Sequence, residues 1–158
     1  VVNLTQSGYN NGQPRWAMDG KAMVWLSDRD GMKNDGSWGG EADAYALFFT
    51  REAYDRFRLS KEEFDLLKGA EEGEKKEEPP DKTPADKPAS DKAATEPIRL
   101  ELDGIDTRKA RLTIHSSRLA DALLSKDGEK LFYLARFEKG FDLWQTELRT
   151  KETKVLAK

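Results

Sequence analysis

The chain repeats itself, and the repeat limits which folds are open to it. Three segments match at a single offset of 108 positions: Leu4-Thr5 with Leu112-Thr113, Asp19-Gly20 with Asp127-Gly128, and Met23–Leu26 with Leu131–Leu134. One offset that holds for separate matches is typical of repeat architectures, in which each copy is one supersecondary unit.

A further match gives the length of one copy. Asp43-Ala44-Tyr45 aligns with Asp142-Leu143-Trp144 at an offset of 99, so the first copy holds nine extra residues, within 29–42. From Leu112 to Leu156 the period is 44 residues, which is the size of a four-stranded blade. The rest of the excess in the first copy is an insertion that begins near Thr50.

The pattern of apolar residues and turns in each copy predicts four short strands. An Asp-Gly pair lies between the first two strands of both copies, where it supplies the positive φ of a tight hairpin. The runs that follow, 22–26 and 130–135, are almost continuously apolar, as strands covered on both faces are. We therefore expect a mostly β chain of about two four-stranded antiparallel β-propeller blades, with one short helix and a disordered charged insertion.

The insertion has its own signals. Thr50 can cap a short helical run, and Ser60 with Glu63 forms a capping box that predicts a helix from about Lys61 to Lys68. From Glu71 to Pro97 there are nine acids, five lysines and five of the six prolines, so this stretch cannot bury enough apolar surface to order itself. The alternation in Ile98–Leu102 predicts a half-buried strand.

These signals divide the chain into four segments. They are 1–50, the first blade, with the closing strand of a preceding blade at 1–7; 51–70, a helical insertion; 71–97, a disordered charged linker; and 98–158, the rest of the first blade and the second blade. Outside the linker the net charge is about neutral, with no basic stripe, so nucleic acid is not an expected partner. No apolar run is long enough for a membrane helix.

Two stretches carry a family resemblance. Pro14–Lys21 followed by Val24–Gly31 resembles the TolB-type propeller repeat, and Pro97–Thr113, with the charged insertion, is similar to the propellers of bacterial tricorn-like serine proteases. The resemblance implies a non-catalytic segment of a larger serine peptidase that scaffolds or gates peptide access to the catalytic core. It also implies a periplasmic or exported parent, although this chain shows no targeting signal. The alternative is a TolB-like module that binds a protein or carbohydrate and has no peptidase attached.

We do not expect this chain itself to be catalytic, whereas the resemblance implies that the parent protein is a serine peptidase. His115 is the sole histidine, and its neighbour Ser116 would point to the other face of a strand. The chain has no cysteine, and Asp28–Gly31 resembles a calcium loop without its full ligand set. We therefore assign no catalytic residue, no metal site and no cofactor.

Binding is expected in the long loop after the second strand. The candidates are Asp28, Arg29, Asp30 and Trp38, because glycine-rich loops at a propeller face commonly carry binding sites. Trp16, Trp25 and Trp144 occupy strand positions, which favours core packing. The expected partners are peptide substrates of the parent protease, or other blades and domains of the same protein. Two blades alone would leave apolar flanks uncovered, so the isolated chain is expected to self-associate.

Overall fold

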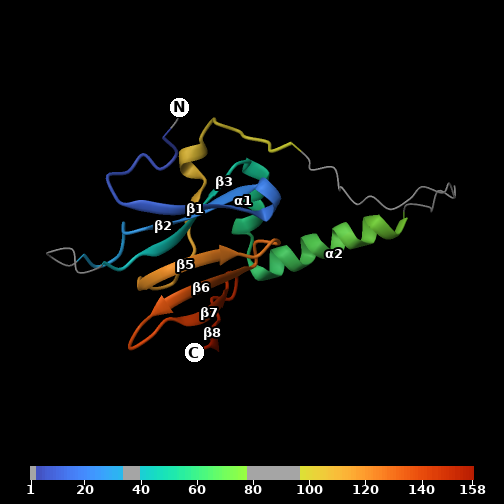
Figure 1. The fold of residues 1–158 in the computed structure, drawn as a ribbon. Coiled ribbons are helices and arrows are strands. Elements are labelled where there is room, and N and C mark those ends of the chain that lie inside the picture. Colours follow the sequence, from blue (N-terminus) through green and yellow to red (C-terminus); the bar gives the residue numbers. More distant parts are fainter. Residues whose placement is uncertain (1–2, 34–39, 78–96) are drawn as a thin grey trace, which may run out of the picture.

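A computed structural model describes residues 3–33, 40–77 and 97–158 of the chain. It contains two four-stranded antiparallel sheets, which lie one above the other in Figure 1. The first, here called unit 1, has the order β1 (Asn11–Ala17), β2 (Ala22–Ser27), β3 (Asp43–Phe48) and β4 (Lys109–Arg111). The second, unit 2, has the order β5 (Arg118–Leu124), β6 (Lys130–Arg136), β7 (Asp142–Glu147) and β8 (Thr153–Ala157). The prediction of a mostly β chain with two such sheets is confirmed.

The sequence repeat is also a repeat of strand register. Cross-strand pairs of unit 1 have their equivalents in unit 2. The pair Trp16–Met23 corresponds to Leu124–Leu131, Trp25–Tyr45 corresponds to Tyr133–Trp144, and Tyr45–Arg111 corresponds to Trp144–Val155. These pairs keep the offsets of 108, 99 and 44 that the sequence shows. Both first strands also carry a bulge near the same point, between Gly12 and Arg15 and between Leu119 and Asp121. The two sheets are therefore two copies of one pairing scheme.

The Asp-Gly pairs close the first hairpin of each unit, as predicted. In unit 1 the turn is a short 3-10 segment, Met18–Gly20, in which Asp19 has φ 54° and Gly20 has φ 85°. In the corresponding turn of unit 2, Gly128 takes a positive φ, at 77°, and its neighbour Asp127 does not. A side chain at Gly128 would also meet the end of Met18, so this turn of unit 2 lies against the turn of unit 1.

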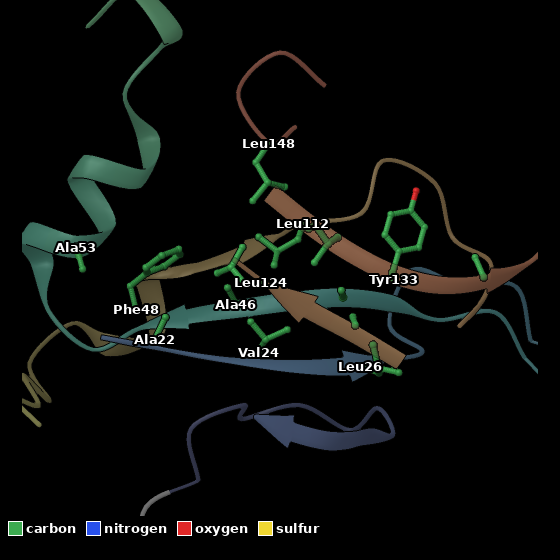
Figure 2. Close-up of a cluster of buried hydrophobic side chains, with 14 residues drawn as sticks. Ala22, Val24, Leu26, Ala46, Phe48, Ala53, Leu112, Leu124, Tyr133 and Leu148 are labelled. Carbon is green, nitrogen blue, oxygen red and sulfur yellow. The ribbon is translucent and has the colours of Figure 1, made fainter. Parts of the chain in front are cut away.

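One hydrophobic core joins the units. Alternate side chains of β2 and β3 in unit 1 meet alternate side chains of β5 and β6 in unit 2, with Leu112 between them (Figure 2). The members from the strands are Ala22, Val24, Leu26, Ala44, Ala46, Phe48, Ala122, Leu124, Leu131, Tyr133 and Ala135. The closest approach of the sheets is where β5 packs against β1 and β2. An ion pair between Arg15 and Asp121, 2.8 Å long, links the two first strands at that edge.

The sheets stack head to tail. The face of unit 1 that enters the shared core contains Val24 and Leu26, whose equivalents in unit 2, Phe132 and Leu134, point away from the core. Conversely, Tyr133 of unit 2 faces the core, while its equivalent Trp25 lies in a second cluster on the outward face of unit 1. The two units therefore meet through different faces: unit 1 contributes the face with Val24 and Leu26, and unit 2 contributes the face with Tyr133.

The insertion forms two helices between β3 and β4. In α1 (Arg51–Arg58), the Thr50 hydroxyl accepts the N–H of Ala53 at 3.2 Å. In α2 (Lys61–Glu77), the Ser60 hydroxyl accepts the N–H of Glu63 at 3.3 Å, and the Glu63 carboxylate accepts the N–H of Ser60 at 2.9 Å. This capping box is confirmed, and the bond from the Ser60 N–H lowers the pKa of Glu63 because it favours the charged carboxylate.

Arg149, after β7, fastens α1 to unit 2. Its guanidinium donates to the carbonyl of Arg56 at 3.1 Å, the carbonyl of Phe57 at 3.3 Å and the carbonyl of Leu59. It also makes two hydrogen bonds with the carboxylate of Glu129. The Arg56 and Phe57 carbonyls belong to the last turn of α1, whose carbonyls lack the usual partner four residues further along the helix. Phe48 stacks on Phe57 with centroids 4.6 Å apart, so α1 touches both units.

Four expectations need correction. The α2 helix ends at Glu77 and not near Lys68, so it enters the stretch expected to be disordered; residues 78–96 of that stretch lie outside the described residues. Residues 3–7 form no strand, because the Asn3 side chain accepts the N–H groups of Thr5 and Gln6 and makes a turn.

The other two corrections concern the segment after the insertion and one tryptophan. Residues 98–102 form no strand, since the buried Arg108 guanidinium, and not a neighbouring strand, binds the carbonyls of Glu101 and Asp103. Trp16 is 59% exposed, in contrast to the core packing expected of it. Trp25, at 7%, is buried as predicted. Among the described residues, no helix has the length and apolar content needed to cross a membrane.

Candidate functional site

A polar network closes one end of unit 1. Its centre is Asp43, the first residue of β3, which is fully buried. Oδ1 accepts from Arg111 Nε at 3.0 Å and Nη2 at 2.8 Å, and from the Thr113 hydroxyl at 2.6 Å. Oδ2 accepts from the Ser116 hydroxyl at 2.8 Å. The carboxylate is thus satisfied on both oxygens, which a buried charge requires.

The network joins the two units. Arg111 belongs to β4 of unit 1, whereas Thr113 and Ser116 lie in the connection that leads to β5. Thr113 also accepts the N–H of Ala44 at 3.3 Å, and Ala42 and Ser117 pair through their backbones. Asp43 therefore holds the connecting segment onto the start of β3.

Asp30 lies beside this network and binds Tyr45. The Tyr45 hydroxyl donates to the Asp30 carboxylate, and the backbone carbonyl of Asp30 accepts from Ser116 at 3.3 Å. Burial raises the pKa of Tyr45 well above its usual value, and the nearby Asp30 carboxylate adds to the effect. Tyr45 is therefore a neutral hydrogen-bond donor at physiological pH.

Next to the network the surface is hollowed, with a volume of about 230 Å³. We call this region the basic hollow. It is lined by Thr5, Ser7, Asn11, Trp25, Ser27, Arg29, Tyr45, Asp106, Lys109 and Arg111. Three of these side chains are cationic and one, Asp106, is acidic. Arg111 is bound to the buried Asp43 carboxylate, so Arg29 and Lys109 are the cations of this lining that can face an anionic group.

Two of the cations in the hollow are already oriented. Lys109 Nζ donates to the backbone carbonyls of Thr5, at 3.1 Å, and Leu4, at 3.4 Å. Arg29 lies over the ring of Tyr9, 5.8 Å from its centroid. A second hollow of about 180 Å³ adjoins the first and shares Trp25 with it, but its walls are mostly apolar. We call it the apolar hollow.

The predicted binding residues are only partly brought together. Arg29 lines the basic hollow. Asp30 does not line it but accepts the hydrogen bond of Tyr45, which does. Asp28 instead accepts the backbone N–H of Asn10 at 3.0 Å and its side-chain amide at 2.8 Å, which is a structural contact. Trp38 lies outside the described residues. The structure does not test whether any of the four binds a ligand.

Sequence reasoning missed the residues that surround Asp43. Arg111 and Thr113 are about 70 positions away from Asp43 in the sequence, and the insertion between them hides the proximity. A signal was nevertheless present. Thr113 is the repeat equivalent of Thr5, and both stand just after a leucine where a blade begins.

His115 is exposed in the connection between the units. Among the described residues it makes no hydrogen bond to Ser116, whose hydroxyl is directed to Asp43. The Ser117 hydroxyl is buried and has no partner within the described part of the chain. These three side chains are therefore not arranged as a nucleophile and its base.

Comparison with known proteins gives a match in structure only. No family model matches the sequence, and no curated protein matches it. The fold is similar to a solved structure titled "Crystal structure of the tricorn protease", with a TM-score of 0.56 over 98% of this chain and 9% sequence identity. The match spans 14% of that protein. It supports the expected tricorn-like relation at the level of fold, while the TolB-type assignment stays a prediction.

Proposed function

We propose that the chain is a pair of adjacent β-propeller blades and a non-catalytic segment of a larger tricorn-like serine peptidase. In this role it scaffolds the catalytic core or gates peptide access to it. The observation that carries the proposal is the head-to-tail stacking of two units with one strand register. The fold likeness to a tricorn protease over nearly the whole chain supports the peptidase context of the proposal.

Head-to-tail stacking distinguishes a blade pair from a sandwich of two equivalent sheets. In a two-fold sandwich, equivalent residues of both sheets would enter the shared core. Here Val24 enters the core and its equivalent Phe132 does not, while Tyr133 enters and its equivalent Trp25 does not. Such a contact between unlike faces is the one that successive blades of a propeller make around a ring.

The approach of the sheets also favours blades. The first strand of unit 2, β5, lies against β2 and β1 of unit 1, and the pair of Arg15 and Asp121 ties the two first strands, as it would near the axis of a ring. At the other side α1 contacts unit 1 through Phe48 and unit 2 through Arg149. An insertion on the outer rim would occupy this position without entering the ring.

The test uses the full-length protein encoded by the parent gene. We expect it to hydrolyse peptides, short ones faster than long or folded ones, and we expect residues 1–158 alone to show no hydrolysis. The coding sequence downstream should contain a serine peptidase core and a PDZ domain. Hydrolysis by the isolated chain that disappears in His115→Ala would contradict the non-catalytic role, and a full-length protein without peptidase activity would contradict the peptidase context.

The second candidate is a TolB-like binding module without a peptidase. The basic hollow favours it, because Arg29 and Lys109 line a cavity of about 230 Å³ and are suited to a ligand or partner with a carboxylate. The same downstream sequence separates the two candidates, since a binding module needs no catalytic core. If that core is absent while the full-length protein retains partners sensitive to Arg29→Ala, the second candidate is the better one.

A further inference from the structure

A further hollow lies where the two units meet, with a volume of about 230 Å³. We call it the junction hollow. It is lined by Glu41, Ser117, Arg118, Arg136, Phe137 and Glu138. Glu41 comes shortly before β3 of unit 1, while the other residues lie at the start of β5, at the end of β6 and in the turn that follows β6. The hollow therefore lies at the end of the junction where Ala42 and Ser117 pair through their backbones.

Two arginines stand directly opposite each other in this hollow. Arg118 and Arg136 are cross-strand partners in β5 and β6. Their equivalents in unit 1, at the offset of 108, are Asn10 and Asp28, which are joined because the Asp28 carboxylate accepts the backbone N–H and the side-chain amide of Asn10. A guanidinium can only donate hydrogen bonds, and like charges opposite each other destabilise a sheet. The two arginines therefore cannot satisfy each other, and their acceptors have to come from elsewhere.

The guanidinium of Arg136 is available in the hollow. Within residues 3–33, 40–77 and 97–158 it forms no ion pair, and it lies over the ring of Phe141, 5.6 Å from the centroid. Glu138, two residues further along, is exposed and likewise forms no ion pair in that part of the chain. The buried Ser117 hydroxyl has no hydrogen-bond partner among the same residues, although buried polar groups normally have one. The hollow thus contains polar groups of both kinds that the described chain does not satisfy.

The charges of the lining are balanced. Arg118 and Arg136 are cationic, and Glu41 and Glu138 are anionic. The Glu41 carboxylate also accepts the backbone N–H of Met32 at 3.3 Å, which leaves Glu138 as the freer of the two acids. A ligand with a negative charge alone would be repelled by the glutamates, and a ligand with a positive charge alone would be repelled by the arginines. A small ligand that carries one charge of each sign finds an opposite charge for both.

Two exposed rings and the size of the hollow narrow the ligand further. Phe137 is 53% exposed and Phe141 is 46% exposed, and apolar rings beside a few polar groups are typical of ligand sites. The volume is below the range of roughly 300–1,000 Å³ that pockets for drug-sized ligands have. The matching ligand is therefore a small molecule with two opposite charges close together and an apolar part beside them.

We propose that the junction hollow is a binding site for a free α-amino acid with an apolar side chain. The carboxylate of the ligand accepts hydrogen bonds from Arg136, its ammonium group donates to Glu138, and its side chain packs on Phe137. The inference goes beyond the proposed function, because neither a peptidase segment nor a TolB-like module requires such a site. Its residues lie at a junction that the chain itself contains.

Isothermal titration of residues 1–158 with L-phenylalanine tests the site. We expect saturable binding with a dissociation constant on the order of 1 mM, as is usual for a ligand with so few atoms. N-acetyl-L-phenylalanine, which lacks the ammonium charge, and L-phenylalaninamide, which lacks the carboxylate, should each bind about tenfold more weakly, the scale of a hydrogen bond to a charged group. Absence of binding by L-phenylalanine, or equal binding of all three compounds, would overturn the proposal.

Two substitutions assign the charges of the ligand to their partners. Arg136→Met should weaken the binding of L-phenylalanine about tenfold and remove its advantage over the amide, while Glu138→Gln should weaken it similarly and remove its advantage over the acetylated compound. Arg99→Met, the matched control, replaces an arginine that is 77% exposed and does not line the hollow, so it should change nothing. Circular dichroism establishes that each variant is folded. Unchanged binding in Arg136→Met, or an equal loss in Arg99→Met, would contradict the site, and neither outcome bears on the peptidase assays.

Discussion

The third strand of each unit begins with an aspartate, but only one of the two is buried. Asp43 of unit 1 is fully buried among Arg111, Thr113 and Ser116. Asp142 of unit 2 is half-buried, and the position equivalent to Arg111 is occupied by Val155. The same contrast holds for Trp16, which is exposed, and its equivalent Leu124, which is not. In each case the residue that has a neighbouring unit on its side is the buried one.

This contrast separates what a unit specifies alone from what its neighbour supplies. Strand register is internal to a unit, because alternation of side chains and the Asp-Gly turns determine it, and it is the same in both copies. Burial is not internal to a unit, since it depends on which face meets another sheet. A single unit with this sequence pattern would have two faces to cover. The shared core covers one face of each unit, and Leu4 and Ile105 cover part of the outward face of unit 1.

The largest test of the comparison is a pair of substitutions at equivalent positions. Leu124→Ala should lower the free energy of unfolding by about 3 kcal/mol, because it leaves a cavity in the shared core. Trp16→Ala removes a larger side chain but should cost less than about 1 kcal/mol in dilute solution, since the ring is mostly in water and contacts the ring of Phe49 along one side. Urea unfolding of both variants measures the difference. Equal losses would show that the two positions are equally covered and would break the comparison.

The aspartates give a second, smaller test. Asp43→Ala should cost about 2 kcal/mol, because it removes a buried carboxylate from three side-chain partners; the figure is reduced because Arg111 is 35% exposed and can be rehydrated. Asp142→Ala, the matched control, should change the free energy of unfolding by less than about 0.5 kcal/mol in dilute solution. If Asp142→Ala is as costly as Asp43→Ala, the carboxylate of unit 2 has a partner within the chain and the contrast between the units disappears.

The sequence contained the repeat, the four strands of each unit and both Asp-Gly hairpins, because these depend on local turn chemistry and on one period. The length of α2 was underestimated, since glutamate and lysine suggested disorder by composition although both are good helix formers. The segment 98–102 alternates like a strand, but the edge of β3 to which it could add is already occupied by β4. No local pattern carries that information.

The candidate site was less accessible to sequence reasoning. Arg29 and Asp30 were found because they belong to a loop with a recognisable composition. Arg111 and Lys109 were not, because they come from β4, which the insertion separates from the rest of unit 1. Exposure of Trp16 could not be predicted from the repeat alone, since equivalent residues share a strand position but not a neighbour.

Titration provides the smallest test, at the position where unit 1 has Tyr45 and unit 2 has Trp144. Burial and the Asp30 carboxylate raise the pKa of Tyr45, so folding favours its protonated form. A tyrosine of the unfolded chain ionises near pH 10, and the stability that neutral Tyr45 contributes is therefore complete below about pH 10 and is lost as the pH rises above it. Near neutral pH the free energy of unfolding does not vary with pH through this group, because Tyr45 is protonated in both the folded and the unfolded chain.

The measurement is the ultraviolet absorbance of the phenolate during an alkaline titration. One of the four tyrosines should ionise above the range of the exposed phenols, and that late step should be missing in Tyr45→Phe. Asp30→Asn should shift the step to lower pH without removing it, because burial, the larger cause, remains. If the curves of the wild-type chain and Tyr45→Phe differ only in the normal range, Tyr45 is accessible to water, and the wall it forms between Asp30 and the basic hollow is open in solution.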